Sequence, residues 1–330
     1  MSAKPMVFLG VAGGWAVAVG LALHLTGVDL GSTAGIALIA VLYMPSPFVA
    51  AVIAERGLLR SRFTLPRGGL RAIVRFLLLP PAVVVCFALA YLAAVYVGGD
   101  VLGLDAVGGL ALTAQQLTDG AAQLLGQAAA DQAGPPPPLV ALLIASVSGA
   151  VLAGWTINGV AAMGEEYGWR GLMWDELKQH GPVRANLVTG VAWGLWHAPL
   201  IVQGYNYPGQ PVLGVLAMVA FCLGMSSVLS ALRERTASVV PVAAAHGIFN
   251  ALAAVLLLVT PYADTVVAGP IGLLGAVLLL LLGVLLWRPL TAAADGQATA
   301  AGPGHRRPAG RRPASTPSGV PADDRTPLAE

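Results

Sequence analysis

The sequence predicts an all-α protein, a polytopic membrane helix bundle with about eight transmembrane helices. Hydrophobic residues make up 57% of the 330 positions and charged residues only 10%, and the mean hydropathy is +0.77. A soluble globular protein carries about 25% charged residues, so this composition indicates an integral membrane protein surrounded by a lipid bilayer. The net charge of +2 is too small to indicate a nucleic-acid partner.

Eight apolar runs approach the length that crosses a bilayer, which is about 20 helical residues. They lie at 6–25, 34–54, 72–97, 139–163, 185–203, 212–232, 237–259 and 266–287. The run at 185–203 is short and contains His197 and Pro199. Pro80 and Pro81 are expected to kink or split the run at 72–97, because proline removes a helical hydrogen bond and clashes with the preceding turn.

Positive charge alternates between the connections of these runs. Arginines and lysines follow the second, fourth, sixth and eighth runs, whereas the connections at 26–33, 98–138, 204–211 and 260–265 contain neither residue. Cytoplasmic loops of membrane proteins carry an excess of Lys and Arg. The alternation therefore predicts that both termini are cytoplasmic, and its consistency supports the count of eight.

The chain divides into three predicted parts. Residues 1–138 contain three spans and an outside connector at 98–138, which is expected to form a short helix ended by the prolines Pro135 to Pro138. Residues 139–288 contain five spans and the polar motifs described next. Residues 289–330 are rich in Pro, Gly, Ala and Arg and have few large apolar side chains, so a disordered cytoplasmic tail is predicted there.

The most informative stretch is Gly164 to Gly171, which places two carboxylates at the end of an apolar run. Ionised groups are costly at membrane depth, so each one is a functional hypothesis that needs a partner. Arg170 lies four residues after Glu166, on the same helical face, and is expected to pair with it. Glu165 has no such neighbour. We interpret Glu165 as the free carboxylate and Glu166 as the braced one, although adjacent carboxylates can titrate as a coupled pair.

Two further apolar runs carry histidines. His197, four residues after Trp193, lies roughly 18 Å from the cytoplasmic end of its run at 1.5 Å per residue, and His246 lies roughly 14 Å from the corresponding end of its own. Asn250 follows His246 by four residues and shares its helical face. A single histidine in a membrane often serves only as a hydrogen bond between helices, and the pattern becomes strong only when all three segments are taken together.

Two kinds of chemistry fit these residues. In the first, Glu165 is a general base that activates a water, His197 helps to hold that water, and His246 with Asn250 stabilises an oxyanion. In the second, His197, His246 and one glutamate (Glu165) bind Zn²⁺, while the other glutamate acts as base. The spacing does not decide between them. We slightly favour the first, which requires no cofactor, because a water held by Glu and His needs no ion.

At these residues the chain resembles the CPBP family of intramembrane proteases, also called the Abi or type 2 CAAX prenyl protease family. The family pattern of Glu-Glu-x-x-x-Arg, aromatic-x-x-x-His and His-x-x-x-Asn is filled by Glu165, Glu166 and Arg170, by Trp193 and His197, and by His246 and Asn250. Trp193 stands where the family more often has Phe. The resemblance covers roughly 139–259 and implies an eight-span helical core that cleaves a peptide bond in or near the bilayer.

The resemblance also implies the residue roles and the substrate class. Glu165 is the water-activating carboxylate, His197 is its partner, and His246 with Asn250 forms the oxyanion side. We count Glu166 with these catalytic residues and expect Arg170 and Trp193 to give structural support. The expected substrate is a membrane-associated peptide or protein, prenylated or of the bacteriocin type, and the expected location is a bacterial plasma membrane. Two other classes stay open: a non-catalytic binding or immunity protein on the same scaffold, and a proton-coupled transporter, for which no repeated halves are visible.

Overall fold

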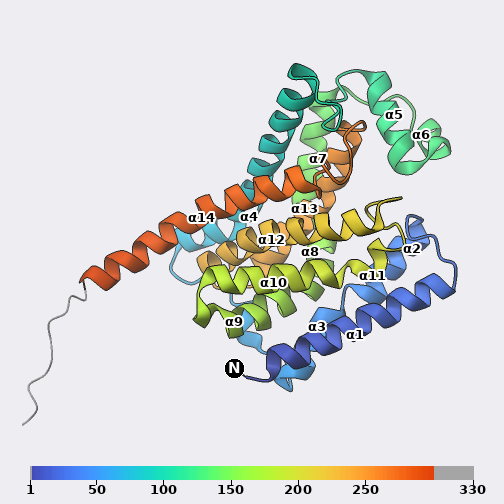
Figure 1. Ribbon diagram of the computed structural model, residues 1–330. Coiled ribbons are helices and arrows are strands. Elements are labelled where there is room, and N and C mark those ends of the chain that lie inside the picture. The colour runs from blue at the N-terminus through green and yellow to red at the C-terminus, as the bar shows by residue number, and fades with distance from the viewer. Residues whose placement is uncertain (1, 301–330) are drawn as a thin grey trace, which may run out of the picture. The chain divides into compact units, whose positions relative to one another are not determined.

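The fold is entirely helical over the residues that the structure describes, and the prediction of a polytopic helix bundle is confirmed (Figure 1). The structure is a computed structural model that describes residues 2–300. The chain divides into one unit of residues 1–288 and a second that begins at Pro289. The account below concerns the first unit. The predicted boundary at residue 138 and the predicted tail remain predictions, and residues 301–330 lie outside the described part.

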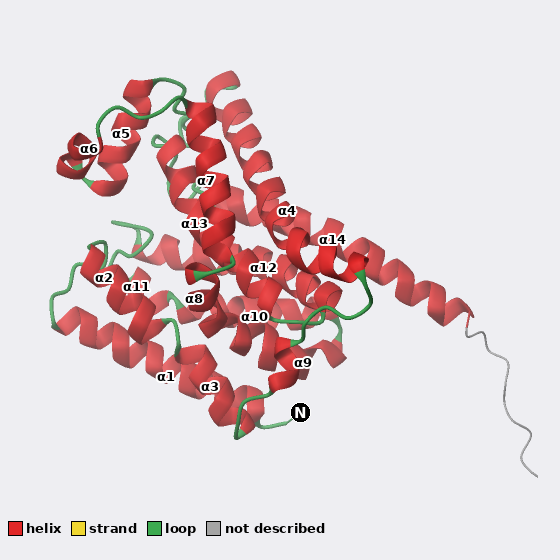
Figure 2. Cartoon of the chain, turned by 180° about the vertical axis from the view of Figure 1, so that it is seen from behind, coloured by secondary structure: helices red, strands yellow, loops and turns green. Residues whose placement is uncertain are grey.

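The first two membrane-length segments form a hairpin. Its helices are α1 (Lys4–Leu25), α2 (Thr33–Leu38), the π-helical turn η1 (Ile39–Tyr43) and α3 (Ser46–Glu55). Helices α1 and α3 pack side by side (Figure 2). The indole N–H of Trp15 donates to the carbonyl of Leu42 at 2.8 Å, which ties α1 to η1. Helix α3 ends at Glu55, and its C-cap residue Arg56, with a φ of 57°, turns the chain into the following loop.

A buried arginine anchors the loop between α3 and the next long helix. Arg62 lies in the 3₁₀ turn η2 (Arg60–Phe63) and its guanidinium contacts Glu55 at 2.5 Å and Asp175 at 3.1 Å. Burial lowers the pKa of Arg62, but the two carboxylates outweigh it and the net pKa is raised. The carbonyl of Arg62 accepts the backbone N–H of Val239 at 2.9 Å, so one residue joins the loop to the start of α13.

The third segment is continuous despite its two prolines. Helix α4 (Leu70–Val95) runs through Pro80 and Pro81 and continues as the π-helical η3 (Tyr96–Val101), so the expected split does not occur. The segment predicted as an outside connector then forms α5 (Ala114–Leu125) and α6 (Gln127–Ala133). Thr113 and Gln116 form a capping box that starts α5. These two helices lie at the edge of the unit in both views (Figure 1, Figure 2).

The segment that carries the carboxylates is bent. Helices α7 (Leu139–Gly154) and α8 (Ile157–Glu166) meet at 54°. The chain continues as the π-helical η4 (Tyr167–Met173), α9 (Trp174–Leu177) and the 3₁₀ turn η5 (Lys178–His180). A side chain at Gly154 would meet Ile248 on α13 at 2.2 Å, so this glycine allows the close contact of α13 with the bend.

The remaining helices complete the bundle. They are α10 (Pro182–Trp196), α11 (Ala198–Ile201), α12 (Pro211–Thr236), α13 (Val240–Val259) and α14 (Leu273–Ala300). Helix α13 packs against α4, α7, α8 and α12, and α10 packs along α12. Thus α13 contacts α8, which carries Glu165. It also contacts α12, which packs along α10, the helix that ends next to His197.

The predicted number of eight spans is not confirmed. Within the described residues, five helices are long and apolar enough to cross a membrane, or six if the bent pair is one span. The run at 185–203 is interrupted at His197, and α10 has only 15 residues. In the run at 266–287, the residues before Leu273 form turns and are not part of the helix. The apolar helix that remains, Leu273–Arg288, is therefore shorter than the predicted span.

Candidate active site

Glu165 and Glu166 lie at the end of α8 and point to different partners. Both are buried. Oε1 of Glu166 accepts from the Arg170 guanidinium at 3.0 Å and from Nδ1 of His246 at 2.8 Å. Oε2 of Glu165 accepts the indole N–H of Trp193 at 2.7 Å. The predicted ion pair between Glu166 and Arg170 is therefore present, and Glu165 has a neutral donor rather than a cation as its hydrogen-bond partner.

Glycines bring the polar helices close together. A side chain at Gly247 would meet the backbone of α8 at Gly159 at 2.6 Å, so α8 and α13 cross at near contact. On the other side, a side chain at Gly194 would meet Val219 of α12 at 2.5 Å, which lets α10 approach α12. These contacts bring His246 to Glu166 and set Trp193 against Glu165. A side chain at Gly164, Gly168 or Gly171 would likewise meet a neighbouring atom, at 3.0, 2.7 and 2.8 Å respectively.

Trp193 contacts more of the site than any spacing indicated. Its ring lies under the Arg170 guanidinium at 4.1 Å. The ring centroids of His246 and His197 lie 5.4 Å and 5.9 Å from it. Its carbonyl oxygen is 2.9 Å from Nδ1 of His197. Trp193 thus joins Glu165, Arg170 and both histidines.

The contacts of the histidines determine which ring nitrogen carries a proton. A carbonyl can only accept, so Nδ1 of His197 carries the proton and its neutral Nε2 is left as an acceptor. Nδ1 of His246 faces a carboxylate oxygen of Glu166. If Nδ1 donates to that carboxylate, Nε2 of His246 donates only in the doubly protonated ring, which the negative charge of Glu166 stabilises.

Asn250 is the one predicted site residue that is not brought into contact with the others. It lies one turn beyond His246 on α13, is exposed, and forms no side-chain hydrogen bond within the part of the chain that the structure describes. Two residues outside the predicted motifs do form hydrogen bonds with the elements of the site. Ser226 accepts from Arg170 at 3.1 Å, and Asn158 donates to the carbonyl of Gly247 at 3.4 Å.

Among residues 2–300 there is no group of three His, Cys, Asp or Glu side chains placed to hold a metal ion. The predicted zinc set of Glu165, His197 and His246 is not gathered into such a group. The acceptor nitrogen of His197 and the carboxylate of Glu165 therefore form the basis of the chemistry considered below.

Comparison with known proteins supports the resemblance. Residues 139–252 match the family described as type II CAAX prenyl endopeptidase Rce1-like. A curated protein of Methanococcus maripaludis, "CAAX prenyl protease 2", is 41% identical over 49 residues, which are 14% of this chain and 18% of that protein. The matched family segment contains Glu165, Trp193, His197, His246 and Asn250.

Proposed function

We propose that this protein is an intramembrane endopeptidase in which Glu165 activates a water; the proposal is supported by the match of residues 139–252 to the family described as type II CAAX prenyl endopeptidase Rce1-like. The observation that carries the proposal is the arrangement around Trp193. The same indole that donates to Glu165 has a backbone carbonyl that fixes the tautomer of His197. A carboxylate and a neutral imidazole nitrogen are thereby held by one residue.

The proposed first step is attack of water on the peptide carbonyl. Oε1 of Glu165 accepts no hydrogen bond within the described residues, so it is available to take a proton from water. Nε2 of His197 accepts the other water hydrogen and orients the oxygen toward the carbonyl carbon. The proton taken by Glu165 is then delivered to the leaving amine. General acid–base catalysis of this kind contributes about 10²- to 10⁴-fold in rate.

The oxyanion side is assigned to His246. Glu166 contacts both Arg170 and the ring of His246 and so holds that ring in place. Glu166 therefore acts through His246 and is a positioning residue. Doubly protonated His246 donates from Nε2 to the oxyanion that develops on the peptide carbonyl, in a buried setting where such a hydrogen bond is strong. Asn250 has an exposed amide on the next turn, and we propose that it joins the oxyanion side when substrate is bound.

A zinc-dependent mechanism is the alternative to a glutamate-activated water. We derive no step through zinc because the described side chains do not form a three-ligand group. The chemistry proposed for Glu165 and His197 is complete without an ion. The chelator experiment described in the Discussion separates the two mechanisms.

The proposed substrate is a membrane-associated peptide whose cleavable segment is cytoplasmic or membrane-embedded. The curated relative is a CAAX prenyl protease by name, so prenylated peptides are one class to test and bacteriocin-type peptides another. We also propose a bacterial plasma membrane with both termini cytoplasmic, on the alternation of charged loops. Cuts mapped to an outer-face segment would contradict this orientation.

Cleavage of a peptide library tests the proposal. Purified full-length protein in detergent is incubated with membrane peptides that carry or lack a prenylated C-terminal cysteine, and products are mapped by mass spectrometry. Wild type is expected to cleave one class and Glu165→Ala none, with Arg184→Ala on an exposed position as the matched control. Peptide retention without cleavage by both wild type and Glu165→Ala would favour the binding-protein alternative. A Glu165→Ala enzyme as fast as wild type would refute the role of Glu165.

A further inference from the structure

His197 lies at a break in the helical backbone, and the break determines the hydrogen bond of its ring. Helix α10 ends at Trp196 and α11 begins at Ala198. In a continuous α-helix the N–H of His197 would bond to the carbonyl of Trp193, four residues back. Here it bonds to the carbonyl of Gly194 at 3.2 Å instead. The Trp193 carbonyl is therefore free to accept Nδ1–H of His197 at 2.9 Å.

The break also frees the carbonyl of Trp196. In a continuous helix this carbonyl would accept the N–H of Leu200. The N–H groups of Leu200 and Ile201 both bond to the carbonyl of His197 instead, at 3.1 and 3.2 Å. Pro199 contributes to the break because it has no N–H to donate to the preceding turn. Trp196 is only 5% exposed, and a buried carbonyl needs a donor, so the donor has to come from another part of the chain.

Tyr43 supplies that donor. It is the last residue of η1, is 1% exposed, and its hydroxyl donates to the Trp196 carbonyl. The rings of the two residues pack with their centroids 4.6 Å apart. Ser46, at the start of α3, accepts the indole N–H of Trp196 at 3.1 Å. The main chain and the side chain of Trp196 are thus both held by residues 43–46, which we call the hairpin joint.

The hairpin joint also packs against the helix that carries Glu165. A side chain at Gly164, the residue before Glu165, would meet the carbonyl of Met44 at 3.0 Å. Helices α3 and α8 also pack against each other. The hairpin joint therefore contacts the backbone next to each of the two groups that are proposed to hold the water, Glu165 and His197.

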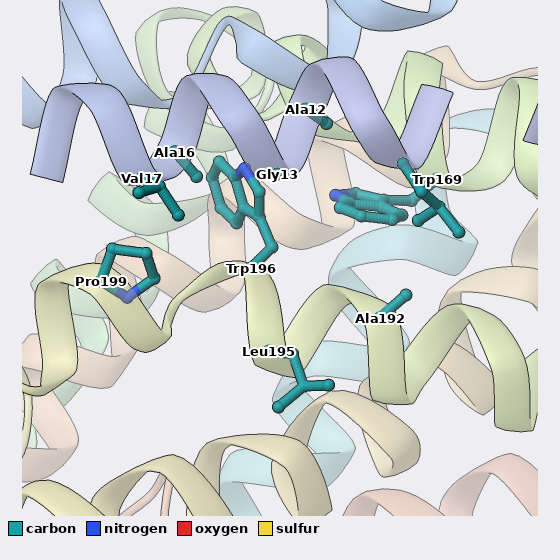
Figure 3. A pocket seen from close by; sticks show the side chains of 10 residues that line it. Ala12, Gly13, Ala16, Val17, Trp169, Ala192, Leu195, Trp196 and Pro199 are labelled. Atoms are coloured by element: carbon teal, nitrogen blue, oxygen red, sulfur yellow. The ribbon is translucent and has the colours of Figure 1, made fainter. Parts of the chain in front are cut away.

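Helix α1 supports the same break from its other end. Trp196 and Pro199 line a pocket beside α1 (Figure 3). A side chain at Gly20 would meet Pro199 at 2.7 Å, so α1 and α11 lie in close contact. The side-chain amide of Gln203 donates to the carbonyl of Gly20 at 3.0 Å. The hairpin of α1 and α3 therefore contacts the chain on both sides of the break, although it lies outside residues 139–252 that match the family.

We propose that Tyr43 is a positioning residue for His197. Its hydroxyl holds the Trp196 carbonyl and so maintains the break, which leaves the Trp193 carbonyl to accept Nδ1–H of His197. Nε2 is then the acceptor that holds the water. Without the hydroxyl, the N–H groups of Leu200 and His197 return to the carbonyls four residues back, and the His197 ring loses its acceptor. This inference rests on the proposed role of His197, and its first test does not depend on cleavage.

The tautomer of His197 tests the inference directly. Full-length protein in detergent is labelled with ¹⁵N-histidine, at a pH where the ring is neutral, and the His197 signals are assigned by comparison with His197→Asn. The two ring nitrogens are distinct, so the spectrum reports which one carries the proton. Wild type is expected to show one form, with the proton on Nδ1, and Tyr43→Phe a mixture of both forms. Tyr91→Phe is the matched control and is expected to match wild type, because its buried hydroxyl also donates to a carbonyl, that of Ala268 at 2.9 Å.

Cleavage provides the second readout. Loss of one hydrogen bond is expected to lower kcat about fivefold in Tyr43→Phe at unchanged KM. Tyr91→Phe is expected to keep the wild-type kcat, with an unfolding midpoint similar to that of Tyr43→Phe. Ser46→Ala, which removes the acceptor of the Trp196 indole, is the second variant and is also expected to give a mixture of tautomers.

The outcomes separate this inference from the proposed function. A single form protonated on Nδ1 in both Tyr43→Phe and Ser46→Ala would overturn the positioning role of Tyr43, as would a Tyr43→Phe enzyme with the kcat of Tyr91→Phe. Neither result would affect Glu165. A mixture of tautomers in Tyr43→Phe, together with a wild-type protein that cleaves no peptide, would support the control of the His197 ring by Tyr43 and count against the proposed function.

Discussion

The indole N–H of Trp193 donates to Oε2 of Glu165 at 2.7 Å, a contact that a phenylalanine at this position could not make. The contact holds one oxygen of the carboxylate and leaves the other available for water. It also makes Trp193 a positioning residue, because the proposed chemistry acts through Glu165 and His197 rather than through the indole.

Replacement of Trp193 by phenylalanine isolates this hydrogen bond. Trp193→Phe keeps an aromatic ring beside Arg170 and His246 but removes the donor. A hydrogen bond to a charged group is worth about 1.5–3 kcal/mol, so kcat is expected to fall about 10- to 100-fold with little change in KM. Trp15→Phe is the control, since it also loses a 2.8 Å indole hydrogen bond, to Leu42, outside the site. Wild-type kcat in Trp193→Phe would contradict the positioning role.

Arg170 is expected to be needed for folding. Its guanidinium is fully buried against Glu166, and its removal leaves a buried carboxylate with only His246 as partner. Breaking a buried pair by removing one partner costs about 3–5 kcal/mol. Arg170→Met is therefore expected to lower the unfolding midpoint in a denaturant titration, whereas Arg184→Met at an exposed position leaves it unchanged. Equal midpoints for the two variants would show that the pair contributes no net stability.

Part of this arrangement could be predicted from the sequence, because it depends on the spacing of residues within one helix. The pairing of Glu166 with Arg170 follows from helical spacing, because positions four apart share a face. The gathering of the three motifs on neighbouring helices was likewise predicted, and His246 does contact Glu166 across 80 positions.

Other features depend on how the helices are rotated and where they end. Trp193 meets Glu165 of α8 in a tertiary contact that composition does not reveal. The approach of α10 to α12 at Gly190 and Gly194 is a second such effect. Asn250 shares a helical face with His246 by spacing, yet it is exposed. The count of eight spans treated every apolar run as a membrane-length helix, whereas the break at His197 and the turns before Leu273 shorten two of them.

Arg62 is expected to couple the loop after α3 to the site. It contacts Glu55 and Asp175, and its carbonyl accepts from the start of the helix that carries His246. Arg62→Gln leaves the Glu55 carboxylate without its buried cation, so we expect a loss of about 3 kcal/mol in the free energy of unfolding and a parallel loss of cleavage. Arg60→Gln, two residues away and exposed, is the matched control. The role of Arg62 is wrong if both variants unfold at the wild-type midpoint.

Metal removal separates the two mechanisms. With Glu165 and His197 acting on water directly, cleavage by wild type is expected to be unchanged after treatment with a strong zinc chelator and dialysis. Cleavage that disappears under chelation and returns on addition of Zn²⁺, but not of Mg²⁺, would support the metalloprotease mechanism instead. A catalytic metalloprotease with known zinc dependence, assayed in the same detergent, serves as the control for chelation.

The central claim is that Glu165 is the base and Glu166 is a brace, and Glu165→Gln tests it most directly. Glutamine preserves the size of the side chain and can still accept the Trp193 N–H, but it cannot take a proton from water. The measurement is the rate of peptide cleavage together with the unfolding midpoint. We predict a wild-type midpoint and a rate at least about 100-fold lower. A folded Glu165→Gln protein that cleaves within tenfold of the wild-type rate would contradict the account.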